Sequence, residues 1–269
     1  MIVGSLLCFK NPITQVAYAP PSAFTLIIDK NGYIGSKQPA AGNTYYAYLD
    51  KQADFSESGL GQVNIIVPEI GSVEIGGRTY KTTKIGNQEW LAENLDYKFN
   101  VNGSQIPING YNTPTTPAAW YYSRDESTYG WTGKKYGLMY NRYAAKYLDD
   151  NKATLLPSGW HVPSKSEWDT LINFVGGLSN AGIILKSDTN DWNNPSGKIG
   201  HGINSYGFNI LPSGYYDSNT FGNLSTVGGF VVPNVTIDVF AMHSSISMMW
   251  SSSTSSTLAE AIRLVKDAT

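Results

Sequence analysis

Short apolar runs rich in β-branched and aromatic residues, separated by prolines, mark the first 70 residues of the chain. Residues 23–28, 45–49 and 63–67 are such runs, and each predicts a strand. Asn31 and Gly32 follow the first run and predict a hairpin turn, because this pair readily adopts positive φ. The pattern predicts a small all-β module over residues 1–70. Such a module is marginally stable alone, so we expect it to anchor or oligomerise the chain.

A different pattern begins at residues 68–71, which we interpret as the boundary between two domains, 1–70 and 71–269. Residues 73–75 and 78–85 predict a β-hairpin closed by Gly76 and Gly77. Residues 98–135 consist mainly of Asn, Gly, Pro, Thr and Tyr, which predicts a long irregular surface loop. Loops of this length in compact domains are usually functional or disordered.

Two helices are expected next, and the second has a clear start signal. Residues 139–148 carry Tyr, Ala and Leu side chains at helical spacing. Ser164 and Glu167 have the spacing of a capping box, with Ser164 as the N-cap. The glycine pair at 176–177 suits the end of this helix. Its buried stripe is predicted to consist of Trp168, Leu171, Ile172 and Val175.

Strand patterns return after residue 200. Residues 206–211, 248–252 and 261–265 each predict a strand, whereas 188–204 and 215–229 are expected to be loops.

The polar character of the chain comes from hydroxyl, amide and tyrosine side chains rather than from charges. Charged residues make up 15% of the chain, which also contains 18 Tyr, 7 Trp and 27 Gly. Rigid aromatic side chains with small polar neighbours are typical of binding surfaces. The net charge of −2 and the lack of a run of Lys and Arg argue against a nucleic-acid partner.

Cys8 is the single cysteine of the sequence, which excludes an intrachain disulfide and a cysteine-based zinc cluster. The segment before it lacks the basic start and the long apolar run of a lipoprotein signal. We interpret it as a short strand with a buried thiol. No stretch reaches the roughly 20 apolar residues of a membrane helix, so we expect no membrane span, and we expect no cofactor.

Several blocks of residues occur in one characteristic order. They are 85–95 (IGNQEWLAENL), 136–140 (YGLMY), 156–164 (LPSGWHVPS) with Glu167 and Trp168, 185–187 (LKS), 206–208 (YGF), 211–215 (LPSGY), 249–252 (MWSS) and 263–267 (RLVKD). With this pattern, residues from about 73 to 267 resemble the Fibrobacter succinogenes major paralogous domain family of bacterial surface and phage-associated proteins.

The resemblance implies a C-type-lectin-like α+β fold, in which a few strands and two helices support a broad loop surface that binds ligands. Related formylglycine-generating enzymes use cysteines in this domain. Residues 73–269 contain no cysteine, so we expect no enzymatic activity of that kind. The region 251–262 is shorter than the aromatic-rich hairpin region that such domains usually hold. Part of the family's binding face is therefore expected to be missing. Either the loops 98–135, 188–204 and 215–229 replace it, or the domain is mainly structural.

Aromatic side chains in the predicted loops are the candidates for ligand binding, because they stack on sugar rings or anchor a protein partner. The alternative is that half of them fold the loop back onto the domain. The candidates are Tyr111, Trp120, Tyr121, Tyr122, Tyr129, Trp131, Tyr215 and Tyr216.

Other conspicuous residues are expected to be structural. His161, His201 and His243 fit no metal-binding spacing, and His161 is expected to make structural hydrogen bonds. Asp188 and Asp191 are candidate calcium ligands, with an Asx-rich surface turn as the alternative. Glu167 and Asp169 are not expected to be a glycosidase pair, because they point to different sides of one helix. The residues expected to be structural are Trp90, Trp160, His161, Ser164, Glu167, Trp168 and Trp250.

These features favour a non-enzymatic virion surface protein of a bacteriophage, a fibre or capsid decoration. Its N-terminal module would attach to a capsid or tail protein, and its lectin-like domain would bind a host glycan or protein. By analogy with fibres, a homotrimer is expected. The alternative is a bacterial cell-surface adhesin or lipoprotein with the same domain. An enzyme of glycan processing is a third reading that no motif supports.

Overall fold

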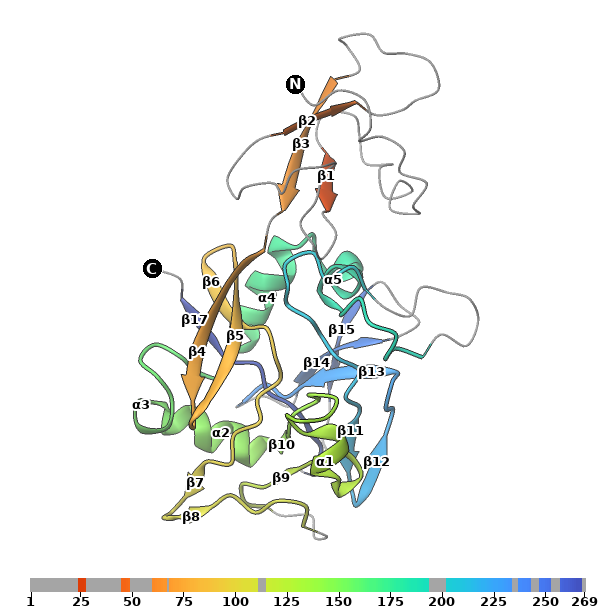
Figure 1. Ribbon diagram of the computed structural model, residues 1–269. Helices are drawn as coiled ribbons and strands as arrows, with labels where there is room; N and C mark the ends of the chain where they lie inside the picture. Colours follow the sequence, from red (N-terminus) through yellow and green to blue (C-terminus); the bar gives the residue numbers. More distant parts are fainter. Residues whose placement is uncertain are drawn as a thin grey trace. The chain divides into compact units, whose positions relative to one another are not determined.

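The chain divides into two units, residues 1–68 and 69–269 (Figure 1). The computed structural model describes three strands of the first unit together with Pro68. Of the second unit it describes residues 69–110, 115–193, 202–233, 237–242, 247–252 and 257–267. Asn31, Gly32, Cys8, Tyr111, His201 and His243 lie outside the described residues.

The first unit contains a three-stranded sheet. Its strands are β1 (Phe24–Ile27), β2 (Tyr45–Tyr48) and β3 (Leu60–Ile66), in the order β1-β3-β2. The three predicted apolar runs do form strands. β3 lies between the other two, parallel to β1 and antiparallel to β2. The strand after β1 in the sequence is therefore not its sheet neighbour.

A four-stranded antiparallel sheet opens the second unit. Its order is β17-β6-β5-β4, with β4 (Glu69–Ile75), β5 (Arg78–Ile85), β6 (Gln88–Leu91) and β17 (Val265–Asp267). Ile75 pairs with Arg78 across the predicted turn. Gly76 and Gly77 both have positive φ, 59° and 77°, as a two-residue hairpin requires. The hairpin is confirmed, and β17 brings the end of the chain against β6.

An eight-stranded sheet forms the other half of the unit. Its path is β12-β11-β16-β13-β14-β15, and β10 pairs with both β16 and β9. The strands are β9 (Ala119–Trp120), β10 (Met139–Asn141), β11 (Tyr215–Asp217), β12 (Thr220–Gly222), β13 (Val227–Phe230), β14 (Ile237–Met242), β15 (Met248–Ser252) and β16 (Ala259–Ala261). A separate small hairpin consists of β7 (Asn100–Val101) and β8 (Ser104–Gln105). The domain is thus a mixed helix-and-sheet structure with more sheet than helix.

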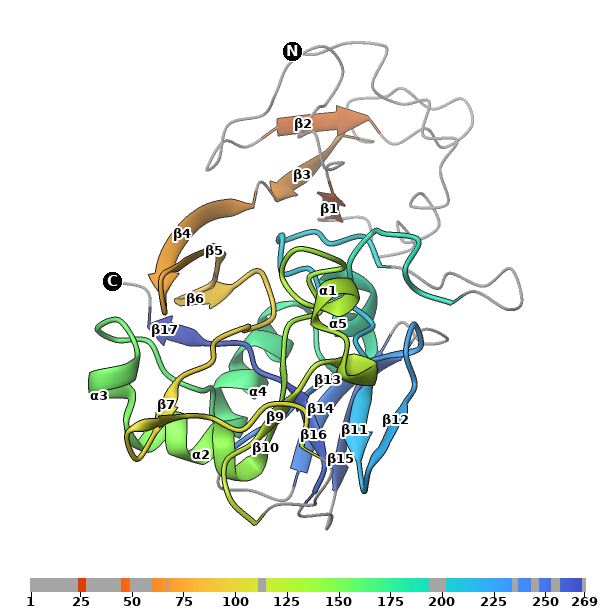
Figure 2. The ribbon, with the colours of Figure 1, turned by 60° about the horizontal axis from the view of Figure 1, so that its bottom comes forward.

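Short helices pack beside these sheets. They are η4 (Tyr122–Arg124), α1 (Glu126–Tyr129), α2 (Arg142–Asp150), α3 (Lys152–Leu155), α4 (Lys165–Phe174) and α5 (Leu178–Leu185). α5 contacts β15, as Figure 1 shows, and α2 contacts β10, as Figure 2 shows. No helix among the described residues is long and apolar enough to span a membrane.

The predicted capping box is confirmed at the start of α4. The Ser164 side chain accepts a hydrogen bond from the Glu167 N–H, and the Ser164 N–H donates to Glu167 Oε2 at 2.8 Å. Two backbone donors that the first turn leaves free are thereby satisfied. The stripe of Trp168, Leu171 and Ile172 is buried, so the helix is fixed by its cap and by its packing.

Two large apolar clusters form most of the core. In one, the Trp90 and Trp168 rings lie 4.8 Å apart and both touch Phe208. Trp160 belongs to the other cluster and is 4% exposed. Trp250 is half-buried beneath the Lys165 ammonium, 4.4 Å from its ring centre. The predicted structural tryptophans therefore pack in or against the core.

Five local predictions were wrong. The predicted surface loop 98–135 contains β7, β8, β9, η4 and α1, and its residues Trp120 and Tyr121 are buried. The helix predicted from residue 139 begins at Arg142, because Asn141 is its N-cap and residues 139–141 pair with β16. Residues 206–211 form no strand; Ile210 makes one isolated bridge to Lys186. The predicted loop 215–229 contains β11, β12 and the start of β13. Residues 261–265 are the junction between β16 and β17 rather than one strand.

Candidate ligand-binding surface

The structure sorts the predicted ligand-binding aromatics into two groups. Trp120, Tyr121 and Tyr216 are fully buried, so a ligand at the surface cannot reach their rings. Tyr122, Tyr129, Trp131 and Tyr215 are half-buried and present part of their surface to solvent. The buried members support the segment that carries the exposed ones.

Trp120 and Tyr216 form the support of this surface. Their rings stack with centres 4.3 Å apart and planes inclined by 20°. The Trp120 indole N–H donates to the Gly110 carbonyl at 2.8 Å, and the Tyr216 hydroxyl donates to Asn219 Oδ1 at 2.8 Å. Both polar atoms are thus satisfied, as buried Trp and Tyr require. The stack connects β9 to β11, which are not adjacent in the sheet.

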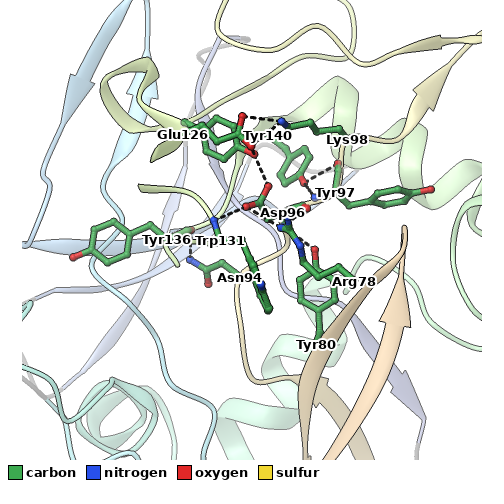
Figure 3. Close-up of polar contacts among 11 residues, drawn as sticks. Arg78, Tyr80, Asn94, Asp96, Tyr97, Lys98, Glu126, Trp131, Tyr136 and Tyr140 are labelled. Carbon is green, nitrogen blue, oxygen red and sulfur yellow. Dashed lines mark hydrogen bonds and ion pairs between the residues drawn. The ribbon is translucent and has the colours of Figure 1, made fainter. Parts of the chain in front are cut away.

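The buried carboxylate of Asp96 holds the segment 121–131 in place (Figure 3). Asp96 accepts from the Tyr121 hydroxyl at 2.6 Å and from the Trp131 N–H at 3.0 Å. The Arg78 guanidinium lies 3.0 Å from Asp96 Oδ2 and supplies the opposite charge. The carboxylate is only 6% exposed, so this set of donors and one cation makes its burial tolerable.

The surroundings of Asp96 keep Tyr121 neutral. Burial first, and then the hydrogen bond to the Asp96 carboxylate, raise the pKa of Tyr121 far above its usual value. On the outer side, Lys98 bonds both carboxylate oxygens of Glu126 at 2.8 and 2.9 Å. This ion pair lowers the pKa of Glu126. Sequence reasoning missed Asp96, because a single Asp in a loop carries no motif.

The half-buried aromatics contact one another and nearby cations. Tyr122 packs against Tyr129 and Phe221, with ring centres 5.2 and 5.3 Å apart. The Trp131 ring lies 4.8 Å from the Arg78 guanidinium and 5.3 Å from the Lys135 ammonium. These contacts cover much of the three rings, so their free faces are limited.

Tyr215 differs from the other exposed aromatics. Within the described residues its ring packs on no other ring and its hydroxyl makes no hydrogen bond, although it lies close enough to Tyr122 to help burial raise the pKa of that residue. It pairs across the β11–β12 hairpin with Gly222. A Cβ placed on Gly222 would lie 2.8 Å from Cζ and Oη of Tyr215. The end of the tyrosine ring therefore lies over a glycine, and the residue is half-buried.

Polar groups border this tyrosine on the same face of the hairpin. Asp217 lies two residues along β11 and pairs with the exposed Thr220 of β12. Asp217 accepts from the Thr257 and Ser218 hydroxyls. An aromatic ring beside a carboxylate and hydroxyls suits a sugar, whose apolar ring face stacks while its hydroxyls form hydrogen bonds.

The calcium candidates do not converge. Asp188 is exposed, and Asp191 pairs with the Lys134 ammonium at 3.2 Å. Among the described residues, no group of three or more His, Cys, Asp or Glu side chains could hold a metal ion. His161 instead contacts Gly159 and forms a very short pair with Glu167. The same Glu167 caps α4, so the segment 159–167 is held by one carboxylate.

Arg263 is a buried cation that sequence reasoning did not single out. Its guanidinium is 0% exposed and donates to Asn94 Oδ1 and to the carbonyl oxygens of Leu91, Phe208 and Asn209. Burial lowers the pKa of Arg263 to about 9, which leaves it charged at neutral pH. It joins the loop after β6 to residues 208–209.

The architecture defines a sheet-rich α and β domain with an aromatic surface built on a buried aromatic and polar scaffold. The family model described as the Fibrobacter succinogenes major domain matches residues 83–267. Since the match covers more than half of the chain, the chain belongs to this family, as the sequence motifs indicated. No curated protein and no solved structure matches the chain.

Proposed function

We propose that the second unit is a C-type-lectin-like domain that binds carbohydrate through the face of the β11–β12 hairpin that carries Tyr215. The observation that carries the proposal is the half-buried Tyr215 ring, whose Cζ and Oη lie over Gly222. A ring held against a glycine is a preformed stacking platform, so binding a sugar costs little ordering of the protein. This role is binding alone and includes no enzymatic step.

The low charge of the chain supports a neutral ligand. Only 15% of its residues are charged, and the polar groups next to Tyr215 are Asp217, Thr220 and Thr257. Carboxylate and hydroxyl oxygens accept hydrogen bonds from sugar hydroxyls. Arg124 lies on the other face of the hairpin, over the Tyr216 and Phe221 rings, and is therefore not part of this site.

The binding test compares the wild-type chain with three variants on a glycan array. Tyr215→Ala removes the platform. Gly222→Ala keeps every functional side chain but places a methyl group where the Tyr215 ring lies. Tyr143→Ala is the matched control, because Tyr143 is half-buried on α2 and makes no hydrogen bond or ring contact within the described residues.

We expect Tyr215→Ala and Gly222→Ala to lose glycan retention about fivefold to 150-fold, in line with the roughly 1–3 kcal/mol that a stacked aromatic contributes. Tyr143→Ala should bind like the wild type. Equal retention by Tyr215→Ala and the wild type would refute the site. Binding of a purified host surface protein but of no glycan, sensitive to the same variants, would replace carbohydrate by a protein ligand.

We further propose that the protein is displayed on a bacteriophage particle, with the N-terminal module attached to a capsid or tail protein and the chain assembled as a homotrimer. A bacterial cell-surface adhesin is the alternative. Immunogold labelling separates the two: particles purified from a lysate carry the label in the first case, and the envelope of intact cells carries it in the second. Sedimentation equilibrium of the full chain tests the trimer.

A further inference from the structure

Two buried carboxylates, on two strands separated by β13, lie near each other in the eight-stranded sheet. Asp238 of β14 is 2% exposed and Glu260 of β16 is 5% exposed. Asp238 Oδ1 and Glu260 Oε2 are both buried without a hydrogen-bond partner in the part of the chain that the structure describes. Buried polar atoms without partners are uncommon and call for a physical explanation.

The space for Glu260 comes from a glycine. A Cβ on Gly229 of β13 would collide with the Glu260 carboxylate, so the carboxyl group occupies the place of a side chain between β16 and β14. The strand order β16-β13-β14 puts Gly229 between the two acids. The sheet thus holds the Glu260 carboxyl group in one position rather than letting it reach solvent.

Charge is not balanced in this cluster. Asp238 Oδ2 pairs with the Arg142 guanidinium of α2 at 2.5 Å, and Arg142 is the cation that acts on both carboxylates within the described residues. β13 contributes no charge. Tyr140 of β10 is the strand partner of Glu260. Its hydroxyl does not bond either acid, because it bonds the backbone N–H and carbonyl of Tyr97. One cation against two buried carboxylates leaves one negative charge uncompensated.

We propose that Asp238 and Glu260 form a proton-binding pair that keeps β16 in the sheet when it holds one proton and loosens β16 when that proton is lost. A proton on either acid leaves one carboxylate for Arg142, which balances the charge. Two carboxylates in a tight buried site do not ionise together at low cost. β16 is bonded to β10, β11 and β13, so the pair affects the strand beside the β11–β12 hairpin.

The shifts in the two acids agree with this arrangement. Burial raises the pKa of Asp238 to about 6, although Arg142 and the nearby Val232 backbone N–H oppose the rise. Burial, and then the charge of Asp238, raise the pKa of Glu260 well above its usual range. A raised pKa in the folded state means that the folded chain holds more protons than the unfolded one. This contribution is present below about pH 4 and is lost as pH rises through the folded pKa values.

The test uses the full chain and follows the proton directly. Infrared difference spectra should show the carbonyl band of a protonated buried acid at about pH 7 in the wild type. We expect the band to be absent from Glu260→Gln and to remain in the control Glu74→Gln, which removes an exposed carboxylate of β4 without a hydrogen bond or ion pair in the described region. In Asp238→Asn, Glu260 is the one remaining acid of the pair and Arg142 can balance its charge. Glu260 should then ionise more easily, so the band should disappear at lower pH than in the wild type.

Urea unfolding supplies an independent readout. Glu260→Gln mimics the protonated acid, so its unfolding midpoint should fall less between about pH 5 and about pH 8 than that of the wild type or of Glu74→Gln. Each pKa unit removed changes the folding equilibrium roughly tenfold.

The proposal is overturned if the wild type shows no protonated-acid band near neutral pH. It is also overturned if added Na⁺ or Ca²⁺ abolishes the band, since a cation would then balance the charge. Neither readout depends on a glycan, so this result stands apart from the binding proposal.

Discussion

The Nε–H of Arg263 donates to Oδ1 of Asn94 over 2.8 Å, a bond between residues 169 positions apart in the sequence. The remaining guanidinium N–H groups reach backbone carbonyls, including Asn209 O at 2.8 Å. The planar Arg263 guanidinium therefore donates to several buried oxygens that would otherwise need a hydrogen-bond donor from a neighbouring strand or helix. It also explains why residues 206–211 are not a strand: two of their carbonyls are turned to Arg263.

Arg263→Lys should destabilise the domain strongly although it keeps the charge. A lysine has one ammonium and cannot reach the same set of acceptors. At least two buried oxygens would lose their donor, at roughly 1–3 kcal/mol each. We expect the free energy of unfolding in urea to fall by about 3 kcal/mol or more. Lys266→Arg, at a partly exposed neighbour, is the control and should change it by less than about 0.5 kcal/mol. A mild effect of Arg263→Lys would mean that water satisfies these carbonyls.

The His161–Glu167 pair links stability to pH in two windows. Burial opposes ionisation of Glu167, yet hydrogen bonds from His161 and Ser164 lower its pKa to about 2 from 4.5. The stability that it contributes is present above about pH 4.5 and is lost as pH falls toward 2. The hydrogen bond to Glu167 raises the pKa of His161 above 6.5. Its contribution is present below about pH 6.5 and is lost as pH rises through the folded pKa.

As pH rises, the wild type should lose the stability that comes from the charged His161, and His161→Gln should show no such loss. The variant should be less stable than the wild type at about pH 5, and the difference should narrow at about pH 8. Thermal unfolding across this range measures it, with Asp169→Asn as a control for the exposed pair with Lys165. A constant difference between His161→Gln and the wild type at all pH values would show that His161 stays neutral.

The sequence patterns predicted correctly those elements that are determined by a few residues close together in the chain. The Ser164–Glu167 capping box needs only four consecutive residues, and the β4–β5 turn needs two glycines with positive φ. Family motifs added the correct family. In these cases, the residues that determine the structure lie next to one another in the sequence.

The missed features depend on distant partners. A run such as 206–211 has strand-like composition, but Asn209 adopts φ of 61° and Arg263 claims its carbonyl. The exposure of each loop aromatic is likewise set by residues far away. Tyr216 is buried by Trp120 and Tyr215 is not, although the two tyrosines are neighbours. Successive residues of a strand point to opposite faces, so predicting a strand at β11 would have assigned Tyr215 and Tyr216 to different faces of the sheet.

This difference between neighbouring tyrosines predicts opposite mutational effects. Tyr216→Ala removes a fully buried ring from the stack with Trp120 and should cost about 3–5 kcal/mol of unfolding free energy. Tyr215→Ala removes a half-buried ring that contacts Gly222 and should cost less than about 1 kcal/mol. Chemical unfolding of both variants checks the contrast. Similar losses would show that Tyr215 supports the fold and would weaken its assignment as a binding residue.

Asp96→Asn tests whether the buried carboxylate organises the segment 121–131. The change keeps the shape but leaves one oxygen, where Asp96 uses Oδ2 for the Trp131 N–H and the Arg78 guanidinium and Oδ1 for the Tyr121 hydroxyl. The Tyr121 hydroxyl then loses its acceptor to an NH₂ group, and Arg78 loses its counter-charge, which should cost roughly 2–4 kcal/mol. Amide exchange should accelerate at Trp131 and in α1 before the rest of the domain, because these groups depend on Asp96 for their position. Asp150→Asn, in the exposed pair with Lys146, should cost no more than about 0.5 kcal/mol. Uniform exchange across the domain in Asp96→Asn would mean that the carboxylate stabilises the whole fold and not this segment in particular.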